Sequence, residues 1–180
     1  MSAVYAWIET VEGKVNASSW EALGAGKLLA DTFGVPLVAL VFGPGAAEVG
    51  AEAGKYGAAQ SLVCDDATLA TFRLEPFAAL LTKLVQDNAP KAVVAVGTSR
   101  GRELLSAAAA DTDSTLLSEV IDMTPGTDKV EVTRPVYAGK LLSDVAALTD
   151  GTLFLTLRTR AFKANPVDEG ASADVTTVEP

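Results

Sequence analysis

Residues 97–101, GTSRG, have the composition of a loop that holds an anion. They follow the apolar run KAVVAV and open the helical pattern SRGRELL. Free backbone N–H groups at the start of a helix attract negative charge, and Arg100 or Arg102 is placed to complete a phosphate site. Gly97, Thr98, Ser99, Arg100 and Gly101 therefore form a candidate anion or nucleotide loop.

The same residues also fit a purely structural role. Thr98 or Ser99 as the N-cap, with Glu103 in the first turn, would provide partners within the chain for the free backbone N–H groups at the start of the helix. The segment lacks the lysine and hydroxyl pair of a Walker A loop, and it is not GxGxxG. The residues alone favour this structural interpretation, with Gly101 at a close approach of helix and strand and Arg100 mostly solvated.

The composition excludes several classes of chemistry. The chain has no histidine, which removes Ser-His-Asp and Cys-His catalysis and the HExxH zinc site. Cys64 is the single cysteine, so it forms no internal disulfide, and we expect it to be a buried small hydrophobe. The formal net charge of −9 repels phosphate backbones and anionic lipid. Neither a nucleic-acid partner nor a membrane association is expected.

Among the acids, Glu9 is the best isolated candidate. It ends the first predicted strand, where it would face the crevice at the strand ends. Asp65 and Asp66 follow another strand, but two adjacent carboxylates point apart and more often start the next element than bind a metal. Because no general acid and base pair up, we predict no catalytic residue and no metal site. Trp7 and Trp20 fit core packing better than base stacking.

Apolar runs alternate with helical patterns over the first 112 residues. Buried strands are predicted at residues 3–9, 35–42, 61–64 and 91–96, and helices at 18–34, 46–57, 76–88 and 99–111. Ser18 with Glu21 fits a capping box, and Gly34 fits the C′ position of the same helix. The order predicts an α/β fold, with a parallel sheet covered on both faces by helices in a Rossmann-like, adenine-nucleotide-binding three-layer sandwich. In the strand order 3-2-1-4-5, the candidate loop borders the ligand crevice.

The pattern changes after residue 112. Strand-like segments without intervening helices follow at residues 115–123, 129–139, 140–148 and 152–159. Turn signals at 125–128 and at Asp150-Gly151 predict hairpins, so this half should add antiparallel strands to the sheet. Residues 164–180 are polar and acidic and predict a linker or tail behind a domain of residues 1–163.

The segment VTRPVYAGK, residues 132–140, contains the remaining candidates of this half. Pro135 lacks a ladder donor and belongs at a strand edge or bulge. Tyr137 is expected to bury its ring, and Gly139 to permit a tight backbone approach. Arg134, and Arg158 further along, are predicted to form structural ion pairs or to bind carbonyl groups rather than to catalyse a reaction.

Neither a signal peptide nor a membrane span is predicted. The N-terminus MSAVYAWIET has no basic region and already contains Glu9. The longest apolar run, GVPLVALVFG, is about half of the roughly 20 residues that a spanning helix needs. We expect a cytoplasmic protein, or a mitochondrial matrix protein if a transit peptide has been removed.

Three separated motifs, GTSRGRELL, VTRPVYAGK and TLRTRAF, resemble the N-terminal domain of the alpha subunit of electron transfer flavoproteins. The resemblance covers residues 3–165. It implies part of a heterodimer that carries electrons, by means of one FAD, from flavoprotein dehydrogenases to a quinone reductase or another acceptor. In this family the FAD is held mainly by a C-terminal alpha-subunit domain that these 180 residues do not include. No cofactor is therefore expected on this chain alone.

The resemblance also implies a scaffold rather than an enzyme. It assigns structural or interface roles to Arg102, Glu103, Arg134, Pro135, Tyr137, Gly139 and Arg158. The expected partner is the beta subunit, bound through the antiparallel half, and the isolated chain is expected to be capable of forming a homodimer through the same face. The alternative is a stand-alone domain that binds ATP or AMP, as adenine-nucleotide-binding stress proteins do, with residues 97–101 on the phosphates.

Overall fold

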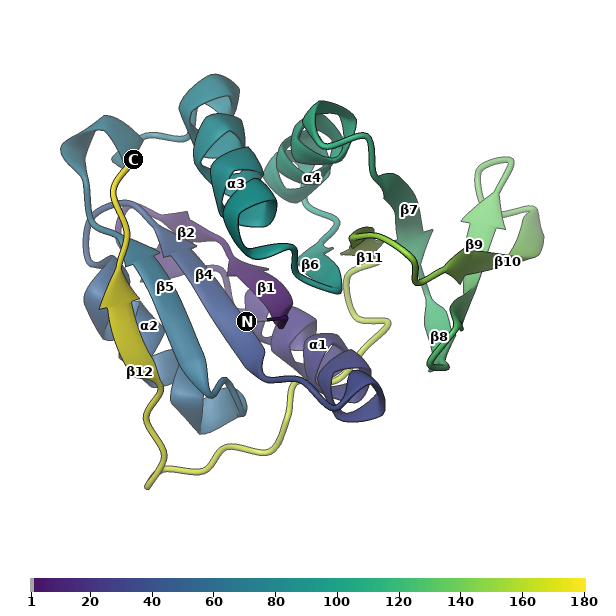
Figure 1. The fold of residues 1–180 in the computed structure, drawn as a ribbon, viewed down its shortest axis with the longest axis horizontal. Helices are drawn as coiled ribbons and strands as arrows, with labels where there is room; N and C mark the ends of the chain where they lie inside the picture. Colours follow the sequence, from purple (N-terminus) through teal and green to yellow (C-terminus); the bar gives the residue numbers. More distant parts are fainter. Residues whose placement is uncertain (1) are drawn as a thin grey trace.

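In the computed structural model, which describes residues 2–180, a parallel sheet is covered by helices on both faces (Figure 1). The sheet order is β12-β5-β4-β1-β6-β11-β7. Its strands are β1 Val4–Ile8, β4 Leu37–Phe42, β5 Gln60–Cys64, β6 Ala92–Val96, β7 Thr115–Val120, β11 Leu153–Leu157 and β12 Asp174–Thr177. The helices are α1 Ser19–Phe33, α2 Ala46–Ala53, α3 Leu74–Asn88 and α4 Ser99–Asp111, with short 3₁₀ helices η1 Gly54–Tyr56 and η2 Ala67–Leu69. The predicted α/β fold class is confirmed.

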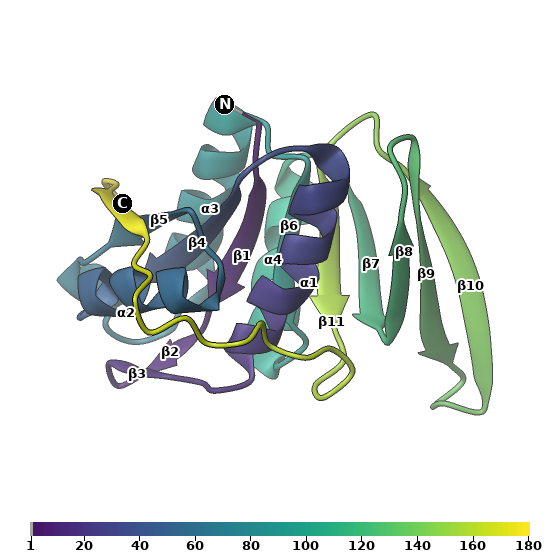
Figure 2. The same cartoon turned by 90° about the horizontal axis from the view of Figure 1, so that it is seen from below.

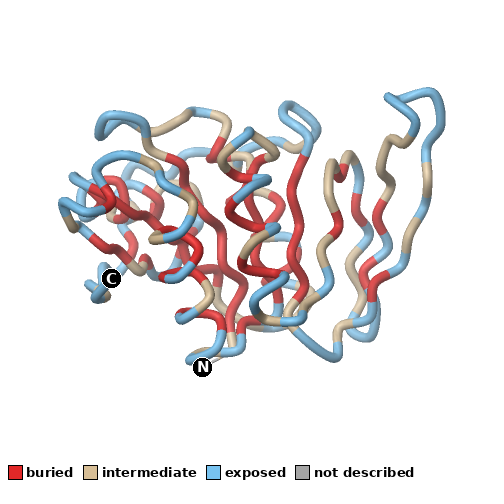
Figure 3. Tube along the Cα trace, turned by 90° about the horizontal axis from the view of Figure 1, so that it is seen from above, coloured by how far each residue is buried: buried red, intermediate tan, exposed pale blue. Residues whose placement is uncertain are grey.

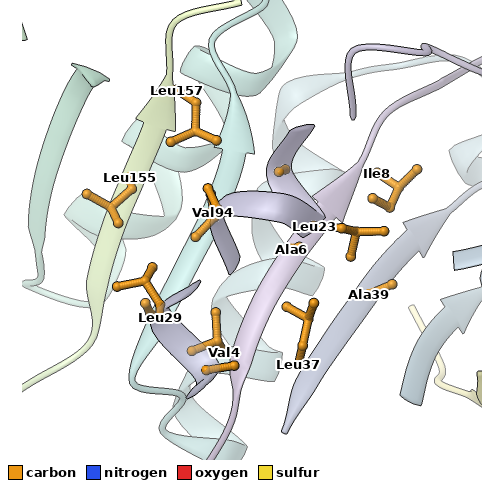
Figure 4. Packing of buried hydrophobic residues seen from close by; sticks show 14 of the residues in the cluster. Val4, Ala6, Ile8, Leu23, Leu29, Leu37, Ala39, Val94, Leu155 and Leu157 are labelled. Atoms are coloured by element: carbon orange, nitrogen blue, oxygen red, sulfur yellow. The ribbon is translucent and has the colours of Figure 1, made fainter. Parts of the chain in front are cut away.

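The core lies in two layers, one on each face of the sheet. Alternate residues of β1 face opposite sides, so Val4, Ala6 and Ile8 pack against α1 (Figure 4). Tyr5 and Trp7 enter the other layer, with residues of α3 and α4. The continuous apolar runs of β1, β4 and β6 follow from this burial on both faces, which Figure 3 shows as the red centre of the molecule.

A separate antiparallel sheet stands beside β7 (Figure 2). It consists of β8 Asp122–Pro125, β9 Lys129–Val136 and β10 Leu141–Leu148, in the order β10-β9-β8, and we call residues 122–148 the arm. The predicted hairpin at 125–128 is confirmed, because Gly126 donates its N–H to the carbonyl of Lys129 at 2.9 Å between the paired strands β8 and β9. A second short ribbon, β2 Thr10–Val11 with β3 Lys14–Val15, follows β1.

The predicted hairpin at Asp150-Gly151 is wrong. Strand β11 leaves the arm and inserts between β6 and β7, parallel to both. All five of its residues are buried, whereas β10 is largely exposed, so burial draws β11 into the sheet interior. Strand β7 is likewise a parallel strand of the main sheet, outside β11, and the antiparallel pairing of this half is confined to the arm.

Residues 163–178, which we call the strap, pack against the sheet and its helices. Strand β12 pairs in parallel with β5 and covers that edge of the sheet. Before it, Asn165 donates to the carbonyls of Tyr56 at 2.8 Å and Leu23 at 3.4 Å. The prediction of a linker or tail missed this strand, while the boundary at residue 163 stays a prediction.

Helix α1 confirms one of its two predicted caps. Gly34 has φ 65°, and the carbonyl of Ala30 accepts the N–H of Val35. The capping box is wrong, because Ser18 makes no side-chain cap and its hydroxyl donates to Asn16 Oδ1 at 2.9 Å. Glu21 instead contacts a segment that is distant in sequence, where its Oε2 accepts the backbone N–H of Arg160 at 2.7 Å.

Burial of Tyr5 makes the stability of the fold decrease as the pH rises in the alkaline range. Desolvation raises the pKa of Tyr5 from 10.0 to about 12, so the unfolded chain loses this proton at lower pH than the folded chain does. The stabilisation is complete below about pH 10 and is lost as the pH rises toward 12. In urea unfolding between these pH values, the wild type should lose stability more steeply than Tyr5→Phe. If the free energy of unfolding falls with pH at the same slope in the two proteins, this expectation is contradicted.

Candidate functional site

The predicted anion loop starts α4 with its own cap. Thr98 has extended backbone, and its Oγ1 accepts the N–H of Gly101 at 3.0 Å. Ser99 is the first helical residue, so the expectation of Thr98 as N-cap is confirmed. Glu103 was expected in the first turn of the helix, but it is exposed and lies beyond that turn. One of the donors that a phosphate would use is therefore already engaged.

Both glycines of this loop mark close backbone approaches. A Cβ on Gly101 would overlap the carbonyl oxygen of Val96, so the prediction of a tight helix and strand contact is confirmed. A Cβ on Gly97 would come within 2.9 Å of the carbonyl oxygen of Leu157. The Gly97 N–H donates to that carbonyl at 2.7 Å, which ties the loop to β11.

Arg100 of the predicted loop and Glu9, the isolated acid of the sequence, face each other at the carboxyl ends of the strands. Arg100 Nη1 lies 3.7 Å from Glu9 Oε1, and the guanidinium carbon lies 5.5 Å from the centre of the Phe72 ring. The Arg100 side chain is 35% exposed, so the expectation of a mostly solvated residue is wrong. Stacking on Phe72 and attraction to a buried carboxylate hold it in place.

Glu9 is buried, with only 6% of its surface exposed. Asn16 donates from Nδ2 to Glu9 Oε2 at 3.3 Å, and its backbone N–H donates to the Glu9 carbonyl at 2.9 Å. The Glu9 N–H donates to Ser19 Oγ at 3.1 Å. Strand β1 thus places a carboxylate at the point where strand order reverses between β1 and β6, as the sequence predicted.

Other carboxylates accept hydrogen bonds from backbone N–H groups along the same edge of the sheet. Asp65 Oδ2 accepts the N–H of Gly45, which precedes α2, at 3.3 Å. Asp66 caps η2, accepting at 2.7 Å from the Thr68 N–H and at 2.6 Å from its hydroxyl, and these bonds lower the pKa of Asp66. Their role in starting the next element is confirmed for Asp66. Within residues 2–180, no group of three or more acidic or cysteine side chains could hold a metal.

The arginines of the two outer motifs make different contacts. Arg102 forms an ion pair with Glu119 at 3.1 Å, which ties α4 to β7. Arg134 donates from Nη2 to Ser118 Oγ at 2.9 Å, and its Nε is buried without a hydrogen-bond partner among the described residues. Arg158 is exposed, and its guanidinium makes no ion pair within residues 2–180, so the predicted ion pair is not found.

The turn of the arm differs from its prediction. Tyr137 is 78% exposed rather than buried, because it begins the turn between β9 and β10. Gly139 has φ 83° with nothing within 4 Å of a Cβ, so it serves turn conformation and not a tight approach. Pro135 faces Leu142 near the end of β9, the central strand of the arm, beyond its paired residues with β8. At Pro135, β9 is therefore paired with β10 alone and has one open side, as expected for a residue without a ladder donor.

The remaining aromatic and sulfur predictions are confirmed. Trp20 stacks on Tyr56 at 4.2 Å, and Trp7 is 3% exposed in the core. Cys64 is buried, and this burial raises the pKa of its thiol. Sequence reasoning missed Phe72 and Asn16, the partners of the Arg100 and Glu9 pair, because both come from loops without a motif. No helix within the described residues is long and apolar enough to cross a membrane.

Comparison with known proteins identifies relatives across nearly the whole chain. The model of the electron transfer flavoprotein domain matches residues 5–180. Protein FixB of Rhizobium meliloti (strain 1021) is 34% identical over 160 residues, which are 86% of this chain and 45% of that protein. Electron transfer flavoprotein subunit alpha of Bacillus subtilis (strain 168) is 25% identical over 171 residues, 95% of this chain and 52% of that subunit.

Another relative belongs to an enzyme complex. Lactate dehydrogenase (NAD(+),ferredoxin) subunit LctC of Acetobacterium woodii (strain ATCC 29683 / DSM 1030 / JCM 2381 / KCTC 1655 / WB1) is 28% identical over 160 residues, 88% of this chain and 38% of that subunit. The chain thus spans about half, or less, of the length of these relatives. In the alpha subunits and FixB proteins, the matched part is the N-terminal half. The chain belongs to the electron transfer flavoprotein family and corresponds to the N-terminal half of its alpha and FixB members.

Proposed function

We propose that this chain is the N-terminal scaffold of an alpha-type subunit in a heterodimeric, FAD-dependent electron carrier. It binds the beta subunit through the arm and itself performs no catalysis. The complete complex passes electrons from flavoprotein dehydrogenases to a quinone reductase or another acceptor. The FAD is held outside these 180 residues, by the domain that follows in an alpha subunit. The family match over residues 5–180 supports this assignment.

The observation that carries the proposal is the exposed apolar surface of the arm. Four large side chains of the β9–β10 hairpin are exposed to 57–78%, namely Tyr137, Leu141, Leu142 and Leu148. Strand β10 is also the outer strand of its sheet, so one side of an eight-residue strand has unpaired backbone groups. An apolar and unpaired edge of this kind is typical of a surface that a protein partner covers.

The carboxyl edge of the sheet supports a scaffold over the alternative of an ATP or AMP site. Thr98, Glu9, Asp65 and Asp66 already pair with the groups that would attract a phosphate. A buried carboxylate beside Arg100 also repels an added anion. A nucleotide would have to displace these internal partners before it gained any contact.

We expect the double variant Leu142→Asp/Leu148→Asp to bind the cognate beta subunit at least tenfold more weakly than the wild type. The two carboxylates would be desolvated in an interface core, where buried hot-spot side chains each contribute about 2 kcal/mol or more. Association is measured by co-expression, pull-down and titration of the purified subunits.

Val167→Asp is the matched control, because Val167 is a similarly exposed apolar residue (50%) on the strap instead of the arm. It should bind like the wild type. Equal affinity of the arm double variant and the wild type would show that the subunit contact lies elsewhere. Gel filtration of the isolated chain tests the same face, since a homodimer through the arm should become monomeric in the double variant.

A further inference from the structure

A small cavity lies at the carboxyl edge of the sheet, on the face that α3 and α4 cover. Its volume is about 160 Å³, and its walls include Trp7, Glu9, Phe42, Phe72, Phe77 and Arg100. The four aromatic rings form one contact series: Trp7–Phe72 at 6.5 Å, Phe72–Phe77 at 4.9 Å and Phe42–Phe77 at 6.0 Å. The cavity is therefore an aromatic box with two acidic residues, Glu9 and Glu12, and one basic residue, Arg100.

Two polar groups of this box have unused hydrogen-bonding capacity. The Trp7 indole N–H is buried without a partner among the described residues. Glu9 Oε1 lies 3.7 Å from Arg100, too far for a hydrogen bond, whereas Oε2 accepts from Asn16. Glu9 Oε1 is therefore free to accept a hydrogen bond from a ligand that carries N–H groups.

We propose that this cavity binds a small single-ring aromatic compound bearing an amidine or amino group. A cavity of about 150 Å³ accepts a benzene ring. The aromatic walls attract a planar cation, and Glu9 accepts its N–H groups in charge-assisted bonds. Arg100 already illustrates the preference, because its own planar cation rests between the Phe72 ring and the Glu9 carboxylate.

The local charge opposes an anionic ligand. Glu9 and Glu12 line the cavity with Arg100, which leaves the lining one negative charge in excess. Glu9 is buried, so its field is weakly screened inside the cavity. A carboxylate or phosphate ligand would meet this field without a free cation to offset it, because Arg100 already faces Glu9.

The test titrates benzamidine into the chain and follows Trp7 fluorescence, with calorimetry as a second measurement. Trp20, the other tryptophan, is replaced by phenylalanine so that the signal belongs to Trp7. Benzamidine should give a saturable change in the millimolar range or below, and benzoate, of the same shape and opposite charge, should give none. Absence of saturable binding, or equal binding of benzoate, overturns the proposal.

Two variants are expected to change the affinity in opposite directions. Glu9→Gln removes the carboxylate and should weaken benzamidine binding at least tenfold, whereas Arg100→Gln removes a competing cation and should strengthen it. A phosphate site would show the reverse order. If Glu9→Gln fails to fold in a thermal melt, Arg100→Gln and Phe72→Leu decide, the latter by weakened binding. Unchanged affinity in the folded variants overturns the proposal.

Discussion

A chain that ends at Lys163 is expected to lose most of its stability, although residues 164–180 are polar in sequence. The removed segment supplies both bonds of Asn165, the N–H of Asp168 to the Lys55 carbonyl at 2.9 Å, and that of Val178 to the Val63 carbonyl at 2.8 Å. It also supplies the β12 ladder. At about 1 kcal/mol for each net hydrogen bond, the sum is several kcal/mol of a total of about 5–15 kcal/mol.

Loss of the strap also uncovers β5, whose edge would then template pairing with other chains. Thermal unfolding and light scattering should therefore show an earlier transition together with aggregation. Gly54→Leu gives an independent check in the full-length chain, because a Cβ there would overlap the backbone of Ser172 and Ala173 and lift the strap. It should lower the melting temperature in the same direction.

The matched control is Glu169→Gln, which breaks the ion pair with Lys55 on the same strap but leaves its backbone bonds. Glu169 is 78% exposed, and such a surface pair contributes little, so the melting temperature should hardly change. If the truncated chain melts like the wild type, the strap is a dispensable tail, as the sequence alone predicted.

The sequence predicted the buried elements because burial leaves a pattern in side chains. Strands β1, β4 and β6 are continuous apolar runs, and their order allowed the crevice beside Glu9 to be placed correctly. Strand β12 has the residues DVTT, which are all exposed. It is held by backbone hydrogen bonds to β5, which leave no pattern in its side chains. The strap was missed for this reason.

Pairings across sheets were harder to predict than the elements themselves. Asp150-Gly151 has hairpin residues, yet the strands on its two sides belong to different sheets, because burial of β11 outweighs local turn preference. The contact of Arg100 with Phe72 was equally hidden, since Phe72 lies in a loop without periodicity. Tyr137 was predicted to be buried because aromatic side chains are usually buried, and the sequence did not show that this one lies in an exposed turn.

Gly101→Ala is expected to destabilise the chain, against the ordinary preference of a helix. Alanine is favoured over glycine within helices by about 1 kcal/mol, so propensity alone predicts a more stable protein. In this structure, however, the new Cβ would overlap the Val96 carbonyl oxygen, and helix α4 would have to move away from β6. Overpacking of this kind costs about 1–3 kcal/mol, and the larger Gly101→Val should exceed it.

Ser106→Ala is the control in the same helix, because Ser106 is exposed and its replacement changes propensity alone. Its melting temperature should stay equal or rise slightly, while that of Gly101→Ala falls by roughly 2–4 °C for each kcal/mol lost. A rise for Gly101→Ala would show that α4 and β6 are not in close contact.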